Sequence, residues 1–194
     1  MSSTSTNIIA AVNQFRELYK QVSLLLQTAD EHMLSRGWEE RGSQCVSGSN
    51  ALKNPTEWLP TLIFRMYNGK HDRKSLVSFV SVFLSDPSCT EAEGHVDEPL
   101  VSAGWYDYGV GRRAPKGLDG WWWTSYHLDH VNRKDNGEII TTDDKKWLEP
   151  EKWDVVRFSS LAVPLVKIQN SDDLLQQVIK PVLDHIGSLG SQPS

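Results

Sequence analysis

The sequence TLIFRMYNGKHDRKSLVSFVSVFL, residues 61–84, indicates the fold class more strongly than any other stretch of the chain. Its two ends, residues 61–67 and 76–84, are rich in β-branched and aromatic residues, a composition typical of strands. Asn68-Gly69 lies in the connection, and Asn-Gly is a frequent turn sequence between antiparallel strands. The stretch therefore predicts a β-hairpin.

Further strands are predicted on the C-terminal side of this hairpin. They have the same apolar and aromatic composition and are separated by turn residues, including a second Asn-Gly pair at Asn136 and Gly137. Pro164 should break the last strand or place its end at a sheet edge, because proline cannot donate to a strand ladder. The segments are residues 100–108, 121–131, 138–142 and 155–168.

A long helix is predicted before the hairpin, over residues 7–36. Thr6 or Asn7 can cap its start, and Gly37 stands where a left-handed residue would end it. The apolar stripe of this helix could pack on a sheet within the same subunit or form the seam of a dimer. Flanking leucines widen the apolar stripe and favour packing on the sheet. The apolar residues alternate at spacings of three and four: Ile8, Val12, Phe15, Tyr19, Val22, Leu26, Ala29 and Met33.

A second helix should close the chain, with Asn170 as its cap and Pro181 as a kink or division. Because the helices flank consecutive hairpin-connected strands, the order predicts an α+β fold. We expect an antiparallel sheet of about five or six strands, packed against a long N-terminal helix and a C-terminal helix. Residues 1–194 should form a single domain, with residues 1–6 and 188–194 frayed and residues 39–54 a loop.

Composition narrows the classes of function. The net charge of −5 disfavours non-specific binding of nucleic acid or anionic membrane, because both need a cationic surface. The only cysteines, Cys45 and Cys89, form no CxxC pair, which argues against a zinc ribbon or a thioredoxin-type site. Without a secretion signal or a membrane-spanning run, a cytoplasmic protein is the simplest prediction.

The main candidate site is the connection GVGRRAPKGLDG, residues 109–120, together with the strand that follows it. Its cations can pair with an anion, while an exposed indole can stack on a ring. Alternation places the odd-numbered residues of the strand on one face. The predicted ligand is therefore anionic and contains a ring, although the tryptophans also fit plain core packing. The candidate residues are Arg112, Arg113, Lys116, Trp121, Trp123, His127 and Asp129.

A divalent metal ion is the alternative cofactor. The segment around His95 and Asp97 has acidic and histidine residues at every other position, and His127 and Asp129 share a predicted strand face. These four residues could together hold a metal that activates water for hydrolysis. The competing interpretation is a solvated acidic loop, and no specific zinc motif such as HExxH is present.

No catalytic motif is specific enough to name a reaction. The GxG pair of GVGRRA follows a predicted strand but does not open a helix, so it does not match a dinucleotide-binding turn. We therefore expect a non-enzymatic ligand-binding or protein-interaction domain without a cofactor, with a divalent-metal-dependent hydrolase as the alternative. The partner is a small molecule or a protein. A monomer is favoured, and a dimer through the N-terminal helix is the other arrangement considered.

Overall fold

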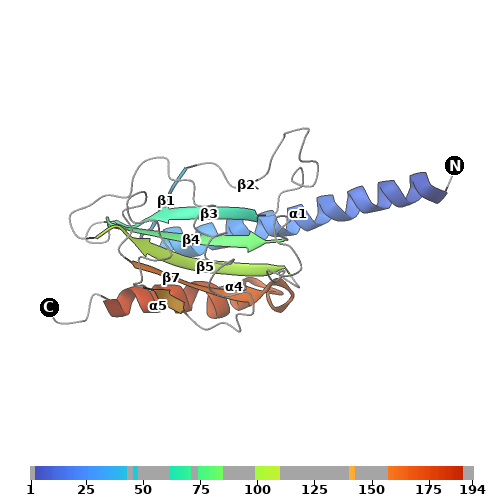
Figure 1. Ribbon diagram of the computed structural model, residues 1–194. Coiled ribbons are helices and arrows are strands. Elements are labelled where there is room, and N and C mark those ends of the chain that lie inside the picture. Colours follow the sequence, from blue (N-terminus) through green and yellow to red (C-terminus); the bar gives the residue numbers. More distant parts are fainter. Residues whose placement is uncertain are drawn as a thin grey trace.

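The computed structural model describes residues 3–42, 46–47, 62–70, 74–84, 99–109, 140–142 and 157–189 (Figure 1). It confirms the predicted α+β architecture. Along the chain, an N-terminal helix comes first, the strands of an antiparallel sheet follow, and a C-terminal helix comes last. The elements are α1 (Ser3–Ser35), β1 (Glu39–Glu40), β2 (Val46–Ser47), β3 (Leu62–Asn68), β4 (Leu76–Phe83), β5 (Leu100–Asp107), β6 (Ile140–Thr142), β7 (Arg157–Pro164), η5 (Leu165–Lys167), α4 (Ser171–Leu174), η6 (Leu175–Ile179) and α5 (Lys180–Leu189).

The described sheet is antiparallel throughout, in the order β1-β3-β4-β5-β7-β6, and β2 also pairs with β3. The predicted hairpin is confirmed, with Leu62 opposite Phe83 and Asn68 opposite Val77. Pro164 is the last residue of β7, as expected for a residue that cannot continue a ladder. The long central strands β3, β4, β5 and β7 form a rigid platform for the helices.

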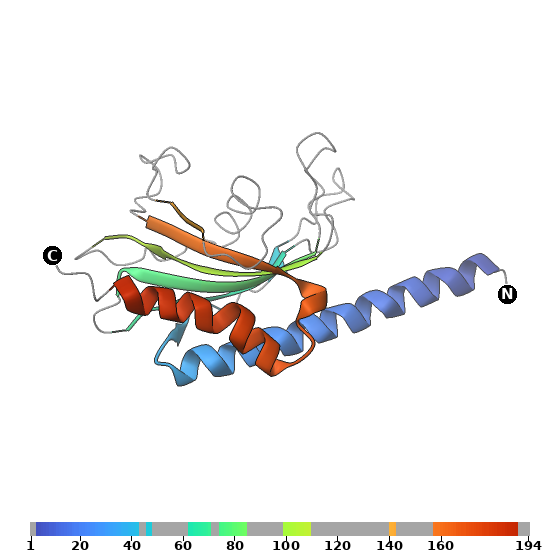
Figure 2. The same ribbon diagram turned by 90° about the horizontal axis from the view of Figure 1, so that it is seen from below.

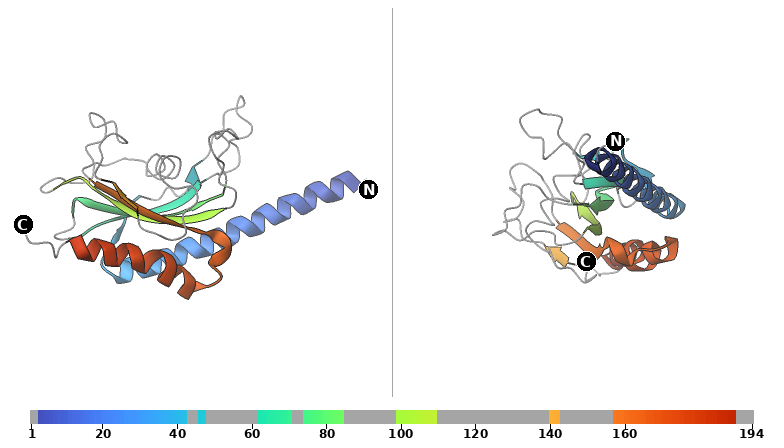
Figure 3. Two further views of the ribbon diagram at one scale, coloured as in Figure 1. Left: turned by 60° about the horizontal axis from the view of Figure 1, so that its bottom comes forward. Right: turned by 90° about the vertical axis from the view of Figure 1, so that its right-hand side faces the viewer.

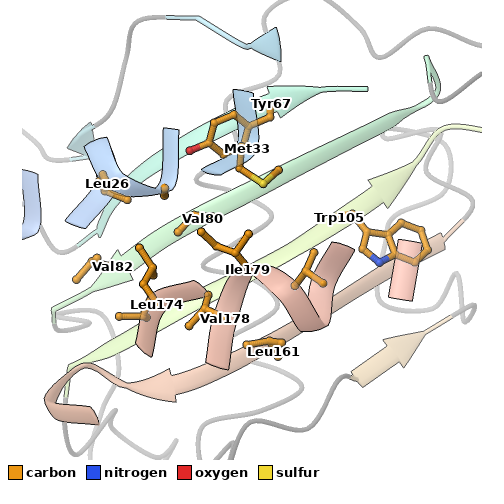
Figure 4. Close-up of a cluster of buried hydrophobic side chains, with 14 of the residues drawn as sticks. Leu26, Met33, Tyr67, Val80, Val82, Trp105, Leu161, Leu174, Val178 and Ile179 are labelled. Carbon is orange, nitrogen blue, oxygen red and sulfur yellow. The ribbon is translucent and has the colours of Figure 1, made fainter. Parts of the chain in front are cut away.

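Both helical regions cover the same face of this sheet, where the C-terminal part of α1 lies beside the segment from α4 to α5 (Figures 2 and 3). Alternate side chains of the strands meet the apolar stripes of the helices and form the larger core. Trp105 and Trp38 belong to it, which supports core packing for these two tryptophans. Figure 4 labels ten of its residues: Leu26, Met33, Tyr67, Val80, Val82, Trp105, Leu161, Leu174, Val178 and Ile179.

The opposite face of the sheet carries a second buried cluster that is rich in aromatic side chains. Phe79, Tyr106 and Phe158 stack on one another across β4, β5 and β7, with ring centroids 5.6 to 6.0 Å apart. Gly104 lies among them, and a Cβ there would approach the Phe79 ring and the Ser160 side chain to 2.8 Å. The rings can pack this closely only because residue 104 has no side chain.

The end of α1 follows the predicted glycine stop. Gly37 has a φ of 83°, its N–H donates to the Leu34 carbonyl, and the Trp38 N–H donates to the Met33 carbonyl. These two bonds are the Schellman pattern, in which a left-handed residue satisfies the last carbonyls of a helix. The turn also directs the buried indole of Trp38 back into the core.

The start of the C-terminal helical region and the proline effect are also confirmed. The Asn170 side chain accepts a hydrogen bond from the Asp173 N–H at 3.0 Å. The π-helical turn η6 lies just before Pro181 and separates α4 from α5. Pro181 has no N–H to donate to the carbonyl four residues earlier, and a π turn is one way for a helix to accommodate that loss.

The observed bounds of several elements differ from the expected segments. Residues 3–6 belong to α1 and residues 188–189 to α5. Serine and threonine lower helix propensity only modestly and do not stop a helix. The segment of residues 39–54 contains β1 and β2, which bond to β3 and are too short to show a strand pattern.

The apolar stripe of α1 is only partly buried within its own chain. Val22, Leu26, Ala29 and Met33 are in the core, whereas the first half of the helix extends beyond the sheet (Figure 1). Four large apolar side chains there are exposed, so the prediction that the whole stripe packs inside the subunit was wrong. Their exposed fractions are 60% for Ile8, 61% for Ile9, 43% for Val12 and 44% for Phe15.

Candidate functional site

The residues predicted to bind an anionic, ring-containing ligand lie outside the described part of the structure. This holds for Arg112, Arg113, Lys116, Trp121, Trp123, His127 and Asp129. The alternative metal ligands His95 and Asp97 also fall outside it. Both sites stay predictions. Among the described residues, no group of three or more His, Cys, Asp or Glu side chains could hold a metal ion.

A charged network joins α1 to the edge of the sheet. Asp30 Oδ1 accepts hydrogen bonds from Arg65 Nε and from the Tyr67 hydroxyl, both at 2.9 Å. Arg65 also pairs with Glu40 of β1 at 2.5 Å. Burial, together with the Asp30 charge, raises the pKa of Tyr67, so its hydroxyl stays protonated and donates to Asp30. Each of the four side chains has a partner inside the chain, which is typical of a structural role.

A serine and a histidine also meet, between β7 and α5. Ser159 Oγ lies 3.2 Å from His185 Nδ1, and the Trp105 ring meets the imidazole edge-on with centroids 5.8 Å apart. Burial, and secondarily the nearby Arg157 charge, lowers the pKa of His185 and favours the neutral ring. The Ser159 side chain is fully buried, so it cannot reach a substrate as a nucleophile. The pair fastens α5 to the sheet.

The exposed stripe of α1 is the feature that the core does not explain. We call Ile8, Ile9, Val12 and Phe15 the α1 stripe. At about 100° per residue, Ile8, Val12 and Phe15 lie within about 60° of one another around the helix, so they form one face. The segment from Ser3 to Phe15 contains no charged residue, and residues 6–15 are all exposed. Solvent-facing helices usually carry charges opposite their apolar face.

A groove begins where the α1 stripe ends. It lies between the middle of α1 and the chain that leads from η5 into α4, and its volume is about 290 Å³. Leu18, Leu24 and Leu25 form part of one wall, and Leu165 and Ile168 form part of the other. Gln21, Thr28, Gln169 and Ser171 add polar groups to its lining. A largely apolar lining with a few polar groups can hold the apolar face of an amphipathic element.

The sequence contained a signal for this site that its periodicity did not reveal. The stripe from Ile8 to Met33 is continuous in spacing, but charged residues begin only at Arg16. This change in composition coincides with the change from exposed to buried apolar positions along α1. The second wall of the groove comes from residues about 140 positions away, a contact that a local pattern cannot show.

Comparisons with known proteins provide no family for this chain. No protein-family model matches it, and neither the curated proteins nor the solved structures contain a significant match. Among the described helices, none combines the length and apolar character that a membrane crossing requires. The proposals below therefore rest on the geometry of the α1 stripe and its groove.

Proposed function

We propose that this chain is a non-enzymatic protein-interaction domain that binds a helical partner through the α1 stripe and the adjoining groove. The single observation that supports this most strongly is the exposure of four large apolar side chains, three of them on one face, on an uncharged, projecting helix segment. Contiguous apolar surface of this kind marks interaction sites in folded proteins.

The energetics of the projecting segment support a partner. Residues 3–17 span about 22 Å of helix, and helices in proteins are stabilised mainly by tertiary packing, which residues 6–17 lack because all of them are exposed. Serine, threonine, asparagine, isoleucine and valine dominate its first turns, and all have lower helix propensity than alanine. Burial of the α1 stripe against a partner would supply the stabilisation that its own chain gives the second half of α1.

The size and lining of the groove favour side chains over a free small molecule. A volume of about 290 Å³ is at the lower limit of the range of ligand pockets, which is about 300 to 1,000 Å³. Its wall on α1 runs from Leu18 to Thr28, about 15 Å along the helix axis. A row of apolar side chains from one helix matches that length, as in the binding of amphipathic helices by hydrophobic grooves.

A photocrosslinker at position 15 tests this function. We expect p-benzoylphenylalanine in place of Phe15, in the full chain inside cells that make the protein, to form a protein adduct on irradiation. The matched control is the same residue at Gln27, which is exposed on the same helix but off the α1 stripe. Equal adducts at both positions, or none at position 15, would refute the proposed function. Mass spectrometry of the adduct identifies the partner.

A further inference from the structure

We draw no further inference here: the strongest candidate, the exposed α1 stripe with the groove beside it, belongs to the site already described, and nothing among the described residues shows which protein covers it.

Discussion

Gly104→Ala is expected to destabilise the fold by about 3 kcal/mol or more. A Cβ at this position would meet the backbone oxygen of Ser159, the Phe79 ring and the Ser160 side chain at distances that real Cβ atoms essentially never show. The Ser159 oxygen belongs to the neighbouring strand, so it can move only if β5 and β7 separate. For a domain with a typical stability of about 5 to 15 kcal/mol, the loss is a large fraction of the total.

Equilibrium unfolding in urea measures this loss. Gly187→Ala is the matched control, because a Cβ there would meet nothing within 4 Å and the residue lies in α5. That variant should be unchanged or more stable by about 0.5 to 1 kcal/mol, as expected for alanine in a helix. A Gly104→Ala protein within about 1 kcal/mol of the wild type would contradict the close packing of β5 against β7.

Asp30→Ala is expected to cost about 2 to 3 kcal/mol. It removes the acceptor of both Arg65 and Tyr67, and the Tyr67 side chain is completely buried. A buried donor without a partner loses its hydration and gains nothing in exchange. We set the value below the usual cost for a broken buried pair because Arg65 retains Glu40 and the Asp30 side chain is 22% exposed.

Glu39→Ala provides the comparison for this measurement. Glu39 pairs with Lys70 at 3.3 Å, but both side chains are strongly exposed, so its loss should cost less than about 1 kcal/mol. The two unfolding free energies should therefore differ clearly. If Asp30→Ala costs no more than Glu39→Ala, the network does not hold α1 against the sheet.

The parts of the fold that the sequence predicted are those specified by local patterns. The β-hairpin, the Gly37 stop, the Asn170 cap and the division near Pro181 all depend on residues close together in the chain. Alternation and turn chemistry are sufficient for such features. Strands β1 and β2 were missed because each has two residues and depends on pairing with β3.

The burial of α1 was predicted wrongly because periodicity identifies an apolar face but not what covers it. Ile8 and Val22 belong to the same stripe, yet Ile8 is largely exposed and Val22 is 2% exposed. The difference depends on where the sheet ends, which is set by the length of long strands, the first of which begins at Leu62, far from α1 in the sequence. The absence of charge before Arg16 was the available local sign that this half of α1 differs from the packed half.

Only one wall of the groove at the candidate site could be predicted from residues close together in the sequence. The wall of the groove on α1 could be anticipated from Leu18, Leu24 and Leu25, which widen the apolar stripe. Its other wall comes from the chain around Leu165 and Ile168, whose position follows from the end of β7 at Pro164. The network of Asp30, Arg65 and Tyr67 was also missed, because its partners are brought together only when α1 lies on β3.

Hydrogen exchange of the backbone amides of residues 7–15 tests most directly whether a helical partner covers the α1 stripe. In the full chain mixed with an excess of the protein that the crosslink at position 15 captures, we expect these amides to exchange at least about tenfold more slowly than in Phe15→Glu under the same conditions, because burial against a partner stabilises the projecting helix. Amides of residues 22–33, which pack on the sheet, should exchange alike in both proteins. Equal exchange of residues 7–15 in the two proteins would contradict the binding of a helical partner through the α1 stripe.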